Sequence, residues 1–348
     1  MHKAERFPSV TPLSRDLEPS LRAAIDQKAK PVGSLGRIET LAIHAGLITQ
    51  SLKPDLGRAA LAIFAADHGV VAEGVTAYPA EISTLVTGMA CDGKAGGNIA
   101  AKGADVEVFV IDAGLRQPHP PHPRLTSRRI GPGTRDFLHE PAMTPDELSE
   151  ALRAGFEIAG DLRAQGFGML ALGEIGIGNT SSAALVAHCV TKLPLDIVVG
   201  PGAGAPPAGL QHKRDVLARS FTRAPVETGL DALREFGGYE IAMMAGAMFG
   251  AANARQIVIV DGFIATAAAC AAVAIDPNLR DYLLFSHQSA EPGHIALMQW
   301  LNAEPFFSFG MRLGEGTGAV LVVPMLRMAQ AMLDTMADLP GPHPTHAK

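Results

Sequence analysis

Two glutamates stand where a carboxylate could take up a proton inside a ligand pocket. Glu315 is the only acidic residue in MRLGEGTGAV, residues 311–320, and a glycine stands on each side of it. Because glycine lets a ligand approach the backbone closely, this carboxylate could point into a cavity and act as a general base. A solvated loop glutamate explains the pattern as well, so Glu315 alone does not identify a site.

The second glutamate, Glu174, ends an apolar run and opens the glycine-rich stretch GEIGIGNTSSAAL. The stretch predicts a strand end, a turn and a helix start, where free backbone N–H groups and hydroxyls can bind a phosphate. A glycine-rich turn with an ordinary N-cap explains it equally well, and the lysine of a Walker A loop is missing. The candidate phosphate-binding residues here are Gly176, Gly178, Asn179 and Thr180.

A second glycine loop, VGPGAGAPPAGLQHKRDV, contains Gly202 and Gly204 and leads into a predicted helix that carries Lys213. A dinucleotide-binding fingerprint needs G-x-G-x-x-G opening directly into the helix, and two prolines interrupt it here. An NAD-dependent dehydrogenase is therefore disfavoured. Lys213 could close on a phosphate, or it could be a solvated surface lysine.

Two further polar groups carry weaker signals. Asp67 and His68 end a predicted strand, but no H-x-H or H-x-x-x-H partner lies nearby, so structural hydrogen bonding is favoured over a metal site. In SHQSAEPGH, residues 286–294, a Ser-His-acid triad would need a G-x-S-x-G elbow, which is absent. We expect Ser289 to be a hydroxyl on the phosphate side and Glu291 to lie near the next helix start.

Composition excludes several classes of protein. The 348 residues are 47% apolar and 18% charged, with a formal net charge of −6. No basic cluster is present, which argues against nucleic-acid binding. The three cysteines lack CxxC spacing and are expected to be buried, reduced thiols of a cytoplasmic protein.

The N-terminus lacks an apolar signal region. In the apolar segment 256–275 Asp261 and Gly262 interrupt the run, so a buried strand leading into a buried helix is favoured over a membrane helix.

An α/β fold must position these side chains. Short apolar runs alternate with helical patterns, and several runs end in a polar residue followed by glycine, as parallel strands with ligand loops do. Strands are predicted at 58–67, 106–114, 168–174, 195–200, 256–262 and 282–287.

Helices are predicted at 15–30, 37–51 and 144–165. The third has a marked start, because Thr144 is an N-cap residue with a proline and a glutamate in the following turn. The proline-rich segment 116–123 is predicted to be an exposed loop in which the histidines are solvated rather than bound to metal. These two histidines are His119 and His122.

Seven segments together resemble the nicotinate-nucleotide:dimethylbenzimidazole phosphoribosyltransferase family of cobalamin biosynthesis. They are KPVGSLGRIETLA, AADHGVVAEGVTAYPAE, GEIGIGNTSSAAL, GGYEIAMMAGA, VIVDGFIATAAA, SHQSAEPGH and MRLGEGTGAVLVVPML, in family order from about residue 31 to residue 326. The resemblance implies a Rossmann-like three-layer α/β fold with a mostly parallel sheet in a catalytic domain at 52–320. A small, mostly helical domain would combine 1–51 with 321–348. A homodimer without metal or organic cofactor is also implied.

The resemblance further implies an activity. The phosphoribosyl group of nicotinate mononucleotide would pass to 5,6-dimethylbenzimidazole, giving α-ribazole 5′-phosphate and nicotinate. Carried over onto this sequence, Glu315 would be the general base and Glu174 a second active-site carboxylate that faces the ribose or the base. The residues implied to bind substrate or its 5′-phosphate are Gly176, Gly178, Asn179, Thr180, Gly202, Gly204, Lys213, Asp261 and Ser289.

The sequence departs from the family pattern near the expected base site. After AYPAE, family members often carry a glutamine that helps to bind the base, whereas Leu85 and Val86 stand in that neighbourhood here. Tyr78 stands where some relatives have serine. A more apolar pocket follows, whose preferred base could be another benzimidazole, a purine or a phenolic compound. A non-catalytic nucleotide-binding homologue is the alternative, and the presence of Glu315 and Glu174 counts against it.

Overall fold

The computed structural model describes residues 9–202 and 206–340. Its strands are β1 (Arg58–Ala66), β2 (Glu107–Gly114), β3 (Leu125–Ser127), β4 (Phe167–Ile175), β5 (Ile257–Val260) and β6 (Leu283–Phe285). Its α-helices are α1 (Glu18–Asp26), α2 (Arg37–Thr49), α3 (Glu81–Cys91), α4 (Gly96–Gly103), α5 (Pro145–Ala164), α6 (Asn179–Thr191), α7 (Leu195–Val198), α8 (Pro207–Arg223), α9 (Gly229–Phe236), α10 (Tyr239–Asn253), α11 (Phe263–Ile275), α12 (Gly293–Trp300), α13 (Thr317–Val320) and α14 (Val323–Thr335). Two 3-10 helices are η1 (Gly69–Glu73) and η2 (Pro277–Tyr282).

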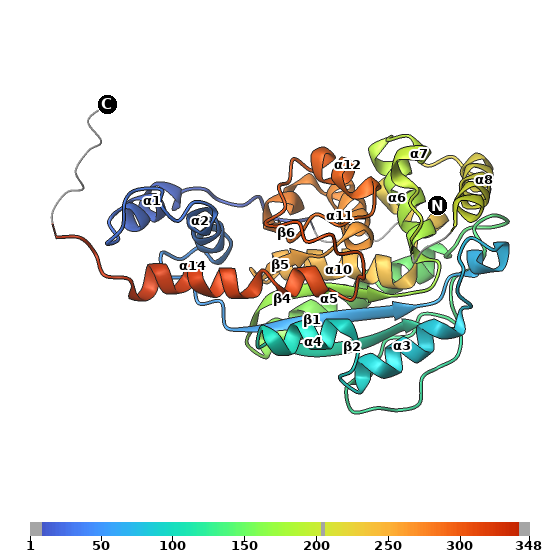
Figure 1. Ribbon diagram of the computed structural model, residues 1–348, viewed down its shortest axis with the longest axis horizontal. Helices are drawn as coiled ribbons and strands as arrows, with labels where there is room; N and C mark the ends of the chain where they lie inside the picture. Colours follow the sequence, from blue (N-terminus) through green and yellow to red (C-terminus); the bar gives the residue numbers. More distant parts are fainter. Residues whose placement is uncertain (1–8, 203–205, 341–348) are drawn as a thin grey trace.

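Six parallel strands form one sheet in the order β3-β2-β1-β4-β5-β6 (Figure 1). The strand order reverses at β1, and ligands of such sheets bind outside the carboxyl ends of the strands near this switch point. All of β4 is buried, as is β1 after its first residue. Strands covered on both faces need this continuous apolar sequence. The predicted α/β class with a parallel sheet is confirmed.

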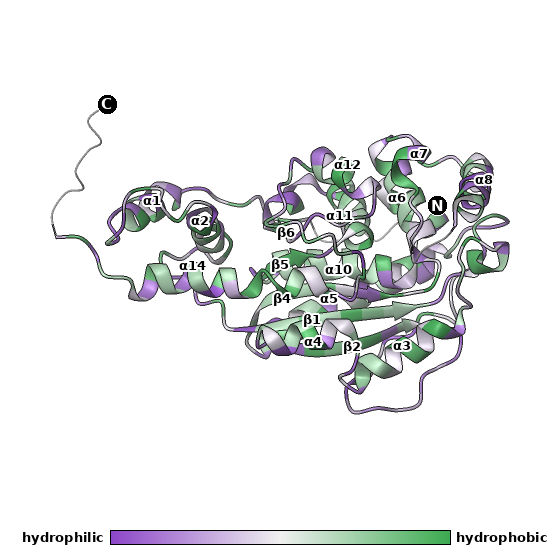
Figure 2. Ribbon diagram, viewed as in Figure 1, coloured by the Kyte–Doolittle hydropathy of each residue, from purple (hydrophilic) through white to green (hydrophobic). Residues whose placement is uncertain are grey.

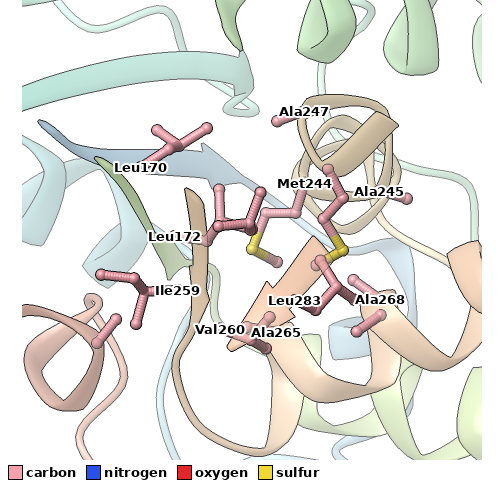
Figure 3. Close-up of a cluster of buried hydrophobic side chains, with 14 of the residues drawn as sticks. Leu170, Leu172, Met244, Ala245, Ala247, Ile259, Val260, Ala265, Ala268 and Leu283 are labelled. Atoms are coloured by element: carbon pink, nitrogen blue, oxygen red, sulfur yellow. The ribbon is translucent and has the colours of Figure 1, made fainter. Parts of the chain in front are cut away.

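Helices cover both faces of the sheet (Figure 1). On one face, Met244 of α10 packs beside Leu172 of β4 (Figure 3). Gly173 points to the opposite face, because successive side chains of a strand alternate. There α4 approaches so closely that a Cβ on its Gly97 would lie 3.4 Å from Cδ1 of Ile63. Hydrophobic residues run along β1 and β2 between these layers (Figure 2).

The predicted strand at 195–200 is wrong. Its first four residues form the short helix α7, which starts after Pro194. Only the end of the segment is buried, whereas Leu195 is half-buried and Ile197 is exposed. The segment therefore lacks the continuous burial of an inner parallel strand. Strand β3 was not predicted, because three residues at the sheet edge are too few to show a pattern.

The other five predicted strands are present, with β6 reduced to three residues. The capping of α5 is also confirmed: Oγ1 of Thr144 accepts a hydrogen bond from the N–H of Glu147 at 3.1 Å, and Oε2 of Glu147 accepts one from the N–H of Thr144 at 2.7 Å. The helices predicted at 15–30 and 37–51 are shorter than expected, since α1 and α2 span nine and thirteen residues.

The apolar segment 256–275 is a strand followed by a helix, as predicted, and contains β5 and α11. Across the described ranges, no helix combines the length and the apolar character that crossing a membrane requires. The loop 116–123 contains neither helix nor strand. The cysteines are buried and unpaired; they are Cys91, Cys189 and Cys270.

Helices α1, α2 and α14 lie together at one end of the molecule (Figure 1). The α1–α2 contact is close, because a Cβ on Gly46 would meet Cδ1 of Leu21 at 2.7 Å. This packing of the two chain ends supports the division that the sequence predicts, with a small domain of 1–51 and 321–348 beside a catalytic domain of 52–320. The division remains a proposal, and residues 1–8 and 341–348 of the small domain lie outside the described ranges.

Candidate active site

A cavity of 340 Å³ opens where β4, β5 and β6 end. The end of β4, the residues that follow β5 and β6, helix α3 and the segment before α13 all contribute to its wall. This is the edge of the sheet at which parallel α/β folds bind ligands. The residues of the sequence prediction that line it are Glu174, Gly176, Asn179, Thr180, Gly202, Ser289 and Glu315.

Glu315 has an unusual backbone conformation. Its φ is 58°, and the flanking Gly314 and Gly316 have φ of 85° and 73°. A non-glycine residue in this region is uncommon and persists only where its surroundings fix it. Oε2 of Glu315 accepts a hydrogen bond from the N–H of Gly97 at 2.8 Å, at the N-terminal end of α4. A helix N-terminus stabilises negative charge, so the site holds a carboxylate in one orientation.

Glu174 is a second carboxylate of the cavity wall, near the end of β4. Its Oε2 accepts a hydrogen bond from Nδ2 of Asn179. Burial raises the pKa of Glu174 well above its usual value, and the nearby charges of Glu240, Asp261 and Glu315 raise it further, while the Asn179 hydrogen bond opposes this. These effects favour the protonated form of Glu174, which can donate a hydrogen bond.

The start of α6 offers side chains rather than a row of free N–H groups. Gly178, with φ of 92°, turns the chain into this helix. The N–H of Asn179 donates to the carbonyl of Gly176 at 3.1 Å, and the N–H of Ser181 donates to that of Gly178 at 2.9 Å. Asn179 and Thr180 of this turn both line the cavity.

Lys213 is buried and is not a solvated surface lysine. Its Nζ donates hydrogen bonds to Oγ1 of Thr180 at 2.9 Å and to the carbonyl of Gly200 at 3.2 Å. Because Thr180 lines the cavity, the ammonium lies directly behind the wall. Burial lowers the pKa of Lys213 to about 8, and the charge of Glu291 opposes this shift. Gly204, predicted beside it, lies outside the described residues.

The segment after β6 supplies polar groups but no activated nucleophile. The N–H of Ser289 donates to Nδ1 of His294 at 2.9 Å, whereas the Ser289 hydroxyl donates to the carbonyl of Met311 at 3.4 Å. Burial lowers the pKa of His294 to about 3, so this imidazole is neutral and serves as an acceptor. Glu291, predicted only to lie near a helix start, lines the cavity together with Arg312.

Asp261 does not line the cavity but holds one of its walls. Its Oδ1 accepts a hydrogen bond from the N–H of Ala319 at 3.0 Å and lies 3.5 Å from Nε2 of His287. Asp261, which follows β5, is thereby linked to α13, the helix that begins two residues after Glu315. His287 itself lines the cavity.

One side of the cavity is apolar. Tyr78, Ile82 and Val86 line it from α3 and the loop before that helix. Leu85 instead lines a separate cavity on the other side of α3. Of the three residues placed near the base by sequence, Tyr78 and Val86 therefore line this cavity and Leu85 does not.

Asp67 and His68 form structural hydrogen bonds, as predicted. Oδ2 of Asp67 accepts from the N–H of Arg116 at 2.7 Å, and both ring nitrogens of His68 have protein partners. Elsewhere, within residues 9–202 and 206–340, three side chains have ligand atoms within 4.8 Å of one another and do not line the cavity. They are Glu73, Asp136 and His139.

Comparison with known proteins agrees with this architecture. A family model described as phosphoribosyltransferase matches residues 10–340. The chain is 45% identical over 337 residues to the nicotinate-nucleotide–dimethylbenzimidazole phosphoribosyltransferase of Cupriavidus necator, with 97% of each chain covered. The chain belongs to this phosphoribosyltransferase family.

Further members of the family match as well. The enzyme of the same name from Aromatoleum aromaticum is 41% identical over 326 residues, which cover 92% of this chain and 95% of that protein. The crystal structure of CobT from Thermus thermophilus has a TM-score of 0.89 and 40% sequence identity, and covers 93% of this chain and 97% of that chain.

Some cavity residues of this phosphoribosyltransferase family member were not predicted from sequence. Isolated apolar side chains carry no chemical signal, and only folding brings them to one wall. They are Ile82, Ile175, Ile177, Phe263, Ile264 and Leu313. Ser83 was also missed, although a hydroxyl two residues after AYPAE could have marked it.

Proposed function

We propose that this enzyme transfers the phosphoribosyl group of nicotinate mononucleotide to 5,6-dimethylbenzimidazole, giving α-ribazole 5′-phosphate and nicotinate. The names of its relatives support this reaction. The structural observation that carries it is Glu315, a carboxylate held by the N–H of Gly97 at the wall of the cavity. In this proposal Glu315 is the general base.

The proposed step is a displacement at the anomeric carbon of the ribose. One benzimidazole nitrogen forms a bond to that carbon while the bond to the nicotinate nitrogen breaks, and nicotinate leaves with that electron pair. Attack from the face opposite nicotinate converts the β linkage to α. The other benzimidazole nitrogen becomes acidic as the bond forms, and Glu315 accepts its proton. A nearby anion also stabilises the positive charge that develops on the ribose.

The 5′-phosphate would lie near the buried Lys213, since an ammonium is a strong donor to phosphate oxygens. Thr180 lies between Lys213 and the cavity and would share this contact. A protonated Glu174 would face the ribose or the base as a hydrogen-bond donor. The remaining residues proposed to contact or support the nucleotide are Gly176, Gly178, Asn179, Gly202, Gly204, Asp261 and Ser289.

The proposed base site is the apolar side of the cavity, around Tyr78 and Val86. We expect that nicotinate mononucleotide plus 5,6-dimethylbenzimidazole yields nicotinate and an α-riboside, and that apolar benzimidazoles react better than purines, because this wall has few hydrogen-bonding groups for a polar ring. Nicotinate release across a panel of benzimidazoles, purines and phenols, with product stereochemistry determined by NMR, measures this. Tight nucleotide binding without product for every base would instead indicate a non-catalytic homologue.

Removing the Lys213 ammonium is expected to weaken nucleotide use. Lys213→Met keeps much of the side-chain volume, and loss of a charged hydrogen bond should lower kcat/KM for the nucleotide roughly 10- to 100-fold. Because the pKa of Lys213 is lowered to about 8, the unmodified enzyme should lose kcat/KM as pH rises above about 8, and the variant should lack this decline.

The exposed Lys53→Met is the matched control for the Lys213 variant and should keep the decline. An unchanged pH profile in Lys213→Met would contradict a role for this ammonium in nucleotide binding.

We also propose that the enzyme is a cytoplasmic homodimer without a metal or organic cofactor. Family resemblance supports the dimer, and so do apolar side chains that are exposed in the single chain, such as Phe309 at 70% and Ile99 at 64%. Light scattering at micromolar concentration tests it, and a mass near 36.3 kDa would contradict it.

A further inference from the structure

A buried hydrogen-bonded group lies directly behind the active-site wall. His68 follows β1, Ser182 belongs to the first turn of α6, and Glu240 belongs to the first turn of α10; all three are 0% exposed. Nε2 of His68 lies 2.7 Å from Oε1 of Glu240, and Nδ1 lies 2.9 Å from Oγ of Ser182. One histidine thus joins three elements that the sequence separates widely.

This group contacts the back of the turn between β4 and α6. A Cβ on Gly176 would lie 3.3 Å from Oε1 of Glu240 and 3.3 Å from Nδ2 of Asn179, and a Cβ on Gly178 would lie 3.4 Å from Cβ of His68. The front of the same turn lines the cavity through Gly176 and Asn179. The turn is therefore held between the substrate site and the His68–Glu240 pair.

We propose that the His68–Glu240 pair is a positioning unit for the phosphoribosyl transfer: it fixes the first turn of α6 and places a carboxylate behind Glu174. This inference rests on the proposed function. It assigns a role in that function to two residues that do not touch the substrate. Through Ser182 the pair determines where Asn179 holds Glu174, since both residues belong to the same helix start.

The charge of Glu240 gives the pair a second effect. Apart from burial, Glu240 is the largest cause of the raised pKa of Glu174; the carboxylates of Asp261 and Glu315 act in the same direction, and the Asn179 hydrogen bond opposes them. Oε2 of Glu240 is buried and has no hydrogen-bond partner among the described residues.

The charge of Glu240 therefore favours the protonated form of Glu174. The site must accept an anionic nucleotide beside several carboxylates, and a neutral Glu174 reduces the repulsion that this nucleotide meets.

Glu240→Gln separates the two effects, because an amide oxygen can still accept a hydrogen bond from His68 while the charge is lost. We expect the carboxyl resonance of Glu174, followed by ¹³C NMR with labelled glutamate and assigned with Glu174→Gln, to titrate at lower pH than in the unmodified enzyme. Removing a neighbouring negative charge lowers a carboxyl pKa, so Glu174 should be ionised at a pH at which it is normally protonated. The nucleotide KM should then rise roughly tenfold.

His68→Gln tests the positional effect. It shortens the link between Ser182 and Glu240, and displacement of the α6 turn should lower kcat/KM by roughly 10- to 100-fold. Glu235→Gln is the matched control, since Glu235 is another buried carboxylate, paired with Arg223 and Arg234 away from the cavity. This control should leave both the Glu174 titration and the kinetics unchanged.

An unshifted Glu174 titration in Glu240→Gln would overturn the electrostatic part of the proposal. Unchanged kinetics in a folded His68→Gln enzyme would overturn the positional part, and a loss of thermal stability alone would show that the pair is only structural. The titration requires no turnover, so it can succeed or fail independently of the proposed reaction.

Discussion

Replacing Glu315 by glutamine is expected to lower kcat about 100- to 10,000-fold, the usual contribution of a positioned general base. Glutamine has the same size, and its amide oxygen can still accept the hydrogen bond from the N–H of Gly97. It cannot take the proton that the benzimidazole loses. The nucleotide KM should change only a few-fold, because the proposed phosphate contacts lie at Lys213 and Thr180. Steady-state nicotinate release at saturating base measures both constants.

Glu227→Gln is the matched control, because Glu227 is exposed in the loop between α8 and α9 and does not line the cavity. It should leave kcat and KM unchanged. Retention of full turnover by Glu315→Gln would remove the general-base role and leave Glu174 as the carboxylate to test next.

The sequence predicted most of the sheet, because buried parallel strands need continuous apolar runs and β1, β2 and β4 have them. It misplaced 195–200, where a similar run follows Pro194 and forms α7. Strand and helix cannot be distinguished in so short an apolar run by periodicity alone. Burial distinguishes them, and burial depends on packing against elements distant in sequence.

The candidate site could be predicted only in part. Glycine patterns and the resemblance to a family marked Glu174, Glu315 and the loops around them. The two loops that contain these glutamates meet at one edge of the sheet. The contact between Glu315 and Gly97 joins residues more than 200 positions apart, so no local pattern could reveal it. The same holds for the His68–Glu240 pair.

Lys213 shows how tertiary structure resolves an ambiguous signal. In sequence it stands between a histidine and an arginine, in a segment that resembles a solvated helix face. In the fold its side chain turns inward to Thr180 and Gly200 and is almost fully buried. Burying an ammonium is costly, which makes its placement behind the proposed phosphate site more informative than its presence in the sequence.

Gly173→Ala is expected to lower kcat roughly 100-fold without changing any catalytic side chain. A Cβ on Gly173 of β4 would lie 2.6 Å from the carbonyl carbon of Glu315, 2.7 Å from its oxygen and 2.8 Å from the nitrogen of Gly316. All three are backbone atoms, so Glu315 itself must move. Its left-handed backbone has few alternative conformations, and a displacement of about 1 Å in a catalytic group can reduce the rate about 100-fold.

Thermal unfolding and kinetics of Gly173→Ala separate misplacement from instability. Overpacking of this kind costs about 1–3 kcal/mol, so the variant should fold and bind nucleotide while its turnover falls. Gly160→Ala is the matched control, because nothing lies within 4 Å of a Cβ at that position on α5. The control should keep full turnover and gain slightly in stability, since alanine favours a helix. If Gly173→Ala retained normal kcat, the contact of Glu315 with β4 would not be what positions the base.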